Sequence, residues 1–87
     1  MKLKWTDKAL SDLRHLYEFL AQGGKPNAIK AIQTLVQAPI VLLTNPHIGE
    51  QLFQFEPRDV RRIQIGGYKI RYEIQESIIY ILRLWHP

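Results

Sequence analysis

The chain has 87 residues and a formal net charge of +4, and hydrophobic residues make up 46% of it, which allows one domain with a modest core and excludes a disordered chain. The absence of cysteine excludes disulfides and thiolate metal sites, and the three histidines lack ligand spacing, so we expect neither a metal nor another cofactor. Neither a secretory leader nor an apolar run long enough to cross a bilayer is visible, so we predict a cytoplasmic protein that does not enter the membrane.

The first part of the chain predicts a short strand followed by a helix. Apolar and polar residues alternate over Lys2–Trp5, which is the period of a strand. Thr6 suits the N-cap of a helix, because its hydroxyl can accept a hydrogen bond from the first turn. Leucines and a tyrosine at helical spacing extend this helix over residues 7–22, and Gly23-Gly24 ends it.

A second helix follows after a few residues, so the two helices are predicted to form an antiparallel hairpin. Pro26 suits the first turn of this helix, and apolar residues continue at helical spacing as far as Leu43. Pro39 lies inside that pattern, where a proline costs roughly 3 kcal/mol in a regular helix. We therefore expect a kink or a break into two shorter helices at Pro39, and an end at Asn45-Pro46.

The second half of the chain predicts strands, because apolar residues now alternate with polar ones. Residues 60–65, 68–74 and 78–85 are rich in β-branched and aromatic side chains, and residues 51–55 are expected to form another short strand. The predicted order is β-α-α-β-β-β in a single domain over residues 1–87. This is an α+β fold with an N-terminal strand and an antiparallel helical hairpin packed on a mainly antiparallel sheet.

A two-residue turn at Gly66-Gly67 fixes which residues of the predicted hairpin face each other. One face then carries apolar residues that suit a helix-covered core: Ile63, Ile65, Tyr68, Ile70, Tyr72 and Ile74. The other face, called the cationic face below, carries Arg62, Gln64, Lys69, Arg71 and Glu73. Because Arg62 lies opposite Arg71 and like charges in that position destabilise a hairpin, the face is predicted either to hold an anion or to be the solvated side of a half-buried sheet.

Two placements stay open at this point. Arg61 falls on the core side in this register, and we expect it to lie beyond the packed region or to extend to its edge. For the last strand, a two-residue turn at Glu76-Ser77 brings His86 to the cationic face, whereas a three-residue turn brings Arg83 there.

Several short motifs, in this order and spacing, resemble the RelE/ParE superfamily of toxins over essentially the whole chain. They are Met1–Trp5, Ala9-Leu10-Ser11-Asp12-Leu13, Asn45-Pro46-x-x-Gly49, Arg61-Arg62-Ile63, Gly67-Tyr68-Lys69-Ile70-Arg71-Tyr72-Glu73-Ile74 and Ile81-Leu82-Arg83-Leu84-Trp85-His86. The resemblance implies the poison half of a type II toxin–antitoxin pair, silenced by a cognate antitoxin protein. Exposed apolar residues on the helical hairpin would be the docking site of that antitoxin.

The superfamily divides by target, and both targets remain open here. RelE- and YoeB-like toxins enter the ribosome and cut mRNA, whereas ParE-like toxins poison DNA gyrase without chemistry of their own. The match to the YoeB pattern at Glu50, Arg62 and His86 favours a ribosome-dependent endoribonuclease. A gyrase inhibitor is the first alternative, and a degenerate member that only binds antitoxin is the second.

For the nuclease, the resemblance implies a catalytic set of Glu50, Arg62, Lys69 and His86. Glu50 or His86 would take the ribose 2′ proton and the other would protonate the leaving oxygen, while the cations stabilise the transition state. Nucleic acid would be bound by Arg61, Arg62, Lys69, Arg71 and Arg83. Lys69 replaces an arginine of the pattern, and Pro87 stands where nuclease members often carry a catalytic aromatic residue.

Overall fold

The first strand runs directly into the first helix through Thr6, whose hydroxyl serves both elements. The computed structural model describes residues 1–86, in which β1 covers Lys2–Trp5 and α1 covers Asp7–Ala21. Thr6 Oγ1 accepts a hydrogen bond from the Ala9 backbone N–H at 3.1 Å, so the predicted N-cap is confirmed. The same hydroxyl lies 2.9 Å from the carbonyl oxygen of Ile81 and donates to it, which ties the helix start to the last strand.

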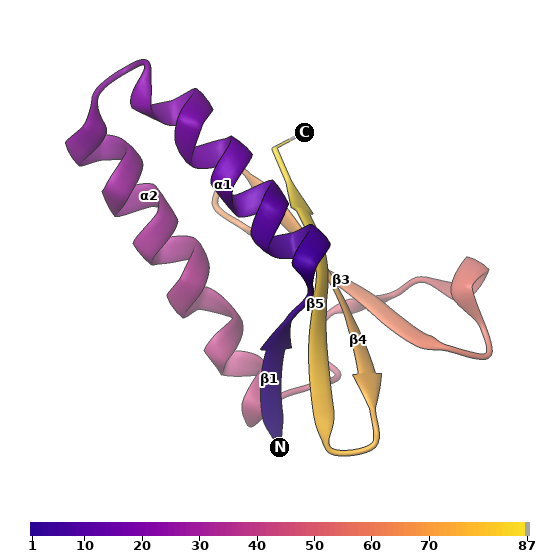
Figure 1. Ribbon diagram of the computed structural model, residues 1–87. Coiled ribbons are helices and arrows are strands. Elements are labelled where there is room, and N and C mark those ends of the chain that lie inside the picture. Colours follow the sequence, from indigo (N-terminus) through magenta and orange to yellow (C-terminus); the bar gives the residue numbers. More distant parts are fainter. Residues whose placement is uncertain (87) are drawn as a thin grey trace.

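The second helix is interrupted at its proline, as predicted. α2 covers Lys25–Gln37 and continues into a 3₁₀ helix, η1, over Ala38–Leu43. Pro39 lies in the first turn of η1 and is buried, so the position where it lacks an N–H coincides with the change of helix type. Figure 1 shows α1 and α2 side by side as an antiparallel hairpin. Within residues 1–86, none of the helices has the length and apolar character that crossing a bilayer requires.

The predicted sheet is present, with five strands in the order β1-β5-β4-β3-β2. The strands after β1 are β2 (Glu50–Gln51), β3 (Asp59–Ile65), β4 (Tyr68–Gln75) and β5 (Ile78–Trp85). β1 pairs with β5 in parallel and all other pairs are antiparallel, so the mainly antiparallel α+β fold is confirmed. The short strand expected over 51–55 is largely wrong.

In that segment Leu52 is buried and the chain then turns away from the sheet. Phe53–Phe55 forms a single 3₁₀ turn, η2, instead of a strand. Only Glu50 and Gln51 pair with β3, opposite Arg62 and Arg61. This leaves η2 and the residues after it free to fold over another part of the molecule.

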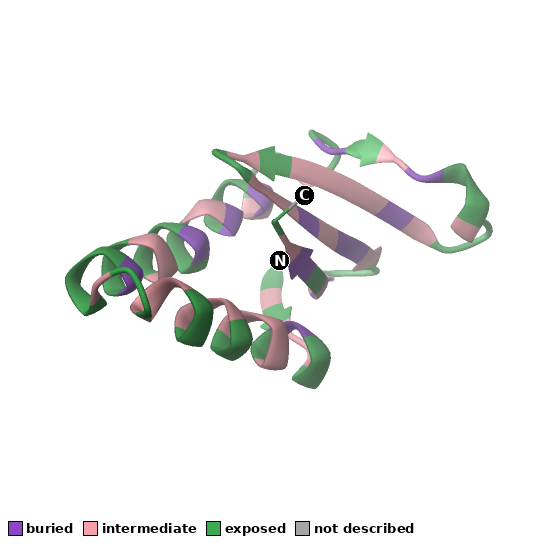
Figure 2. Cartoon of the chain, turned by 90° about the horizontal axis from the view of Figure 1, so that it is seen from above, coloured by how far each residue is buried: buried purple, intermediate pink, exposed green. Residues whose placement is uncertain are grey.

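The core lies between the helical hairpin and one face of the sheet. Figure 2 shows both helices on the same side of the sheet. The buried cluster joins both layers and consists of Ala9, Leu35, Leu42, Ile70, Tyr72, Ile79, Ile81 and Leu84. Ile63, Ile65, Tyr68 and Ile74 pack against it, so the predicted apolar face of the β3–β4 hairpin is confirmed, with Ile65 opposite Tyr68.

The last strand contains a bulge that neither expected turn length included. Gln75 pairs with Ile78 across a two-residue turn, and Tyr72 still pairs with Ile81. One residue further, Arg71 pairs with Arg83, so Leu82 is the extra residue that exchanges the faces of β5. Both alternatives for this strand are therefore corrected: the turn has two residues, and yet Arg83 and Trp85, not His86, lie on the cationic side.

Candidate functional site

The loop that leads to Glu50 is fastened by one buried tyrosine. The Tyr72 hydroxyl donates a hydrogen bond to the Pro46 carbonyl at 2.7 Å and accepts one from the Gly49 N–H at 3.0 Å. A Cβ on Gly49 would lie 2.6 Å from that hydroxyl and 3.0 Å from the Arg62 carbonyl oxygen, so only glycine fits. Burial raises the pKa of Tyr72, which keeps the hydroxyl protonated as a donor. The Asn45-Pro46-x-x-Gly49 motif thus has a structural reason in this chain.

Arg61 holds the same loop from the side. Its guanidinium donates to Asp59 Oδ1 at 2.9 Å and to the carbonyls of His47 and Gly49, both at 3.1 Å. Its side chain is only 14% exposed. Arg61 therefore lies at the edge of the packed region, as one of the two expectations had it, and its donors are engaged inside the protein rather than turned toward a nucleic acid.

Glu50 and Arg62, two of the four residues assigned to catalysis, do come together. They are directly opposed on β2 and β3, and Arg62 Nη2 lies 2.7 Å from Glu50 Oε2. The Glu50 side chain is 65% exposed and that of Arg62 is 33% exposed, so the pair sits at the surface near the edge of the sheet. Their charges neutralise each other in this arrangement.

Arg71 is held between two aromatic rings. Its guanidinium carbon lies 5.2 Å from the ring centre of Phe55 and 5.2 Å from that of Trp85, as cation–π contacts require. Phe55 comes from η2, which folds over the cationic face. The expectation that this face is the solvated side of the sheet is therefore wrong at Arg71, because aromatic side chains enclose its charge.

Glu73 offsets a cation that the sequence did not single out. Arg58 reaches it with two hydrogen bonds, Nε to Oε2 at 3.0 Å and Nη2 to Oε1 at 2.7 Å. The hydrogen bonds from Arg58 hold the pKa of the Glu73 carboxyl below its usual range, against the effect of burial. In the sequence, the one signal for such a partner is a glutamate in the middle of a predicted strand. In the structure the Glu73 side chain is only 6% exposed.

Arg83 lies on the cationic side by register, but its charge is matched by α1. Its Nε and Nη2 donate to the two oxygens of Asp12 at 2.7 and 3.1 Å. Asp12 also accepts the Leu84 N–H at 3.1 Å, beyond the part of β5 that β1 covers. Burial acts to raise the pKa of Asp12, but the hydrogen bonds from Arg83 and Leu84 outweigh it and the net shift is downward.

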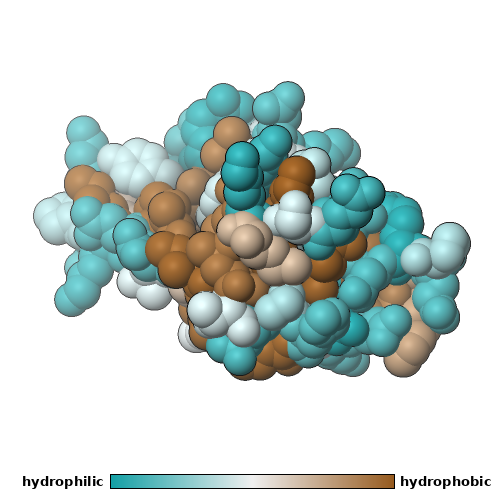
Figure 3. Space-filling view, turned by 90° about the horizontal axis from the view of Figure 1, so that it is seen from below, coloured by the Kyte–Doolittle hydropathy of each residue, from teal (hydrophilic) through white to brown (hydrophobic). Residues whose placement is uncertain are grey.

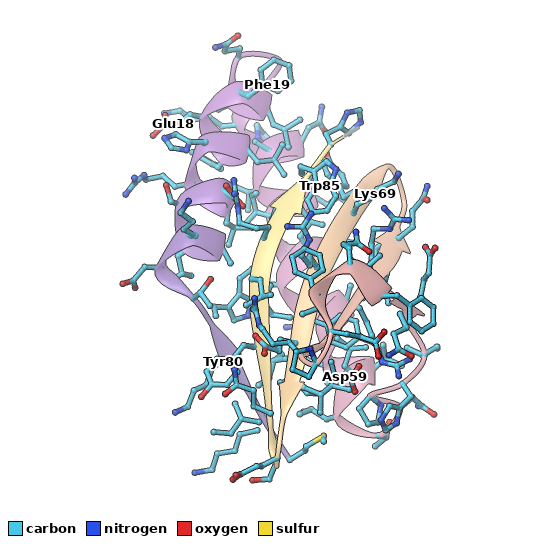
Figure 4. All side chains as sticks on the ribbon, turned by 90° about the vertical axis from the view of Figure 1, so that its right-hand side faces the viewer. Glu18, Phe19, Asp59, Lys69, Tyr80 and Trp85 are labelled. Atoms are coloured by element: carbon cyan, nitrogen blue, oxygen red, sulfur yellow. The ribbon has the colours of Figure 1, made fainter. Side chains whose placement is uncertain are left out.

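Lys69, like Arg71, has no ion pair among residues 1–86. It pairs with Gln64 on one side and with Trp85 on the other, and Figure 4 shows Lys69 and Trp85 as neighbours at the same end of the sheet. Arg62, Lys69 and Arg71 therefore share a face but not an environment. One is ion-paired, one lies beside Trp85 and one is enclosed by rings.

His86, the fourth residue assigned to catalysis, lies on the other side of the sheet. Its ring packs edge-on against Tyr68, with centroids 5.2 Å apart and an interplanar angle of 70°. Tyr68 packs against the core, so the structure does not bring His86 to the face that carries Glu50 and Arg62. Pro87 lies outside the described residues. Within residues 1–86, no three or more acidic or histidine side chains are grouped so that they could hold a metal ion.

A helical hairpin on a five-stranded sheet, with an initial parallel strand and a basic hairpin, defines a small toxin of the RelE/ParE superfamily. Residues 3–87 match the family described as ParE toxin of type II toxin-antitoxin system, parDE. The chain belongs to this family. It is therefore the toxin component of a type II toxin–antitoxin system, with a cognate antitoxin as its partner.

A solved structure agrees with the family. A chain described as the chromosomal ParDE TA system from P. aeruginosa superposes with a TM-score of 0.81 at 26% sequence identity. The superposition covers 99% of this chain and 95% of that one. No curated protein matches the sequence.

Proposed function

We propose that this toxin acts as a ParE-type inhibitor of DNA gyrase and does not cleave mRNA. The observation that carries the proposal is the match of residues 3–87 to the ParE family, since ParE-like toxins poison gyrase whereas the nuclease branch resembles RelE and YoeB. This reverses the preference that the match at Glu50, Arg62 and His86 gave to the nuclease.

The geometry of those residues supports the same choice. General acid–base cleavage needs both groups within hydrogen-bonding reach of one phosphodiester, at roughly 2.6–3.2 Å from the protons they move. Here Glu50 is bound to Arg62, and His86 packs on Tyr68 on the opposite face of the sheet. A nuclease mechanism would require the last residues of β5 to leave the core side. Binding without chemistry requires no such rearrangement.

The antitoxin, in this proposal, docks on exposed apolar residues of the helical hairpin. Phe19 on α1 is 68% exposed, and on α2 and η1 Ile29 and Ile40 are 47% and 48% exposed. Figure 3 shows a further group of apolar side chains on the lower side of the molecule, at the opposite end from Phe19 (Figure 4). Exposed apolar side chains grouped in this way are typical of a surface that another protein covers.

The test compares the two targets in parallel. Purified toxin is added to gyrase and relaxed plasmid, and supercoiling is measured; in cells, the toxin is induced without antitoxin and mRNA ends are mapped by primer extension. We expect inhibited supercoiling and unaltered transcripts. Glu50→Gln and His86→Ala should inhibit gyrase as the wild type does, because neither residue takes part in a reaction.

The contrary result is equally specific. Ribosome-phased cuts in mRNA that disappear in Arg62→Ala, together with normal supercoiling, would refute the gyrase proposal and restore the nuclease hypothesis.

Phe19→Ser tests the antitoxin surface separately, since it should weaken antitoxin binding and leave gyrase inhibition intact. Undiminished antitoxin binding by Phe19→Ser would contradict the assignment of the hairpin surface.

A further inference from the structure

A pocket lined mainly by cations opens where η2 meets the start of α1 and the bulge of β5. Its volume is about 380 Å³. Its lining includes Lys8 of α1, Phe55 of η2, Arg58 of the turn after η2, and Arg71, Leu82 and Arg83 of the sheet. The Glu50–Arg62 pair does not contribute to its lining, although Arg62 lies directly opposite Arg71 on the neighbouring strand. The sequence motifs that indicated the toxin family do not account for this pocket.

The pocket carries an excess of positive charge. Of its four cationic side chains, Arg58 is matched by Glu73 and Arg83 by Asp12. Lys8 and Arg71 have no ion pair among residues 1–86. Two positive charges are therefore left over in a shallow, partly apolar hollow.

Arg71 is positioned for a ligand rather than for an internal partner. The rings of Phe55 and Trp85 hold its guanidinium from both sides, and its Nε is buried without a hydrogen-bond acceptor. A buried N–H without an acceptor is uncommon and unfavourable, so Arg71 is not satisfied by an internal partner. An arginine fixed in this way has lost its conformational freedom before binding, which favours contact with an oxyanion.

We propose that this pocket binds a small phosphate monoester, with the phosphate between Arg71 and Lys8. A monoester carries a charge of about −1.5 to −2 at pH 7 and three acceptor oxygens, which matches two unpaired cations better than a carboxylate or a phosphodiester does. A pocket of about 380 Å³ also exceeds the space of a bare phosphate and falls in the range of roughly 300–1,000 Å³ typical of small-molecule sites. Phe55 and Leu82 supply apolar wall for the esterified group.

The proposal is independent of gyrase, because it concerns a ligand of the free toxin. The probes are AMP as the monoester, cyclic AMP as the matched diester with a single charge, inorganic phosphate and a short DNA duplex. Binding is measured by calorimetry and by amide shifts in the NMR spectrum. We expect AMP to bind roughly tenfold or more tighter than cyclic AMP, which corresponds to about 1.4 kcal/mol. AMP should also bind more tightly than inorganic phosphate.

Two variants locate the site. Lys8→Ala removes an exposed side chain in the first turn of α1 and should weaken AMP binding roughly tenfold. Arg71→Met should weaken AMP binding by a similar factor. The control Lys25→Ala, at the far end of the helical hairpin, should have no effect. If Arg71→Met fails to fold, Lys8→Ala and the shifts of residues around Leu82 still decide. Equal affinity for AMP and cyclic AMP, AMP binding unaffected by Lys8→Ala, or DNA bound more tightly than AMP would each overturn the proposal. The last result would assign the pocket to nucleic acid.

Discussion

Replacing Tyr72 by phenylalanine tests whether one hydroxyl fastens the loop before β2. Tyr72 is fully buried and its hydroxyl makes two hydrogen bonds, to the Pro46 carbonyl and from the Gly49 N–H. Each such bond contributes about 0.5–1.5 kcal/mol net, and a buried N–H left without an acceptor costs about 1–3 kcal/mol. The Pro46 carbonyl is partly exposed and can be hydrated, whereas Gly49 is buried. We therefore expect Tyr72→Phe to lower the free energy of unfolding by about 2–3 kcal/mol.

The assay is urea unfolding followed by tryptophan fluorescence, with the midpoint expected to fall at constant slope. For a domain of this size the loss corresponds to a melting temperature lower by roughly 8–24 °C. Tyr80→Phe is the matched control, because the Tyr80 hydroxyl makes no hydrogen bond among residues 1–86, and its effect should stay within about 0.5 kcal/mol. A Tyr72→Phe variant as stable as Tyr80→Phe would refute the idea that the hydroxyl fastens the loop.

Three further outcomes follow from the same contacts. Gly49→Ala should destabilise the fold by about 1–3 kcal/mol through overpacking, because the added Cβ would lie 2.6 Å from the Tyr72 hydroxyl. In a double-mutant cycle with Tyr72→Phe, the two effects should be coupled rather than additive. Asp12→Asn should cost about 1–2 kcal/mol at neutral pH, measured by urea unfolding, since it weakens charged hydrogen bonds from a half-exposed arginine. Asp12 and Glu73 both have lowered pKa values in the folded state. Their stabilisation is therefore present above the unfolded pKa of about 4 and is lost as pH falls through the folded pKa. The melting temperature should fall less steeply with decreasing pH for Asp12→Asn than for the wild type.

The local features of the fold were predictable because each depends on a few adjacent residues. Gly66-Gly67 alone fixes the register of β3 and β4, and the observed pairs of Ile63 with Ile70 and Arg62 with Arg71 agree with it. Thr6 caps α1 and Pro39 splits the second helix for equally local reasons. In each case the backbone chemistry of one or two residues leaves few alternatives.

The features that decide the site were not predictable in this way. The bulge at Leu82 follows no glycine or proline. Ile81, Leu82 and Leu84 are all apolar enough to face either way, so the face of Arg83 could not be deduced. The Arg83–Asp12 pair joins residues 71 positions apart, which no local pattern encodes. η2 folds back so that Phe55 contacts Arg71, which makes a strand position expected to be solvated part of a pocket.

The resemblance to the nuclease pattern at Glu50 and Arg62 has an explanation that needs no catalysis. These residues are directly opposed on a two-residue strand at the edge of the sheet, where an acid and a base are a favourable cross-strand pair of about 0.2–1 kcal/mol. Gly49, which Tyr72 holds in place, leads directly into this two-residue strand. Chemistry would be specified by what lies beside them, and in this chain His86 lies across the sheet while aromatic rings enclose Arg71.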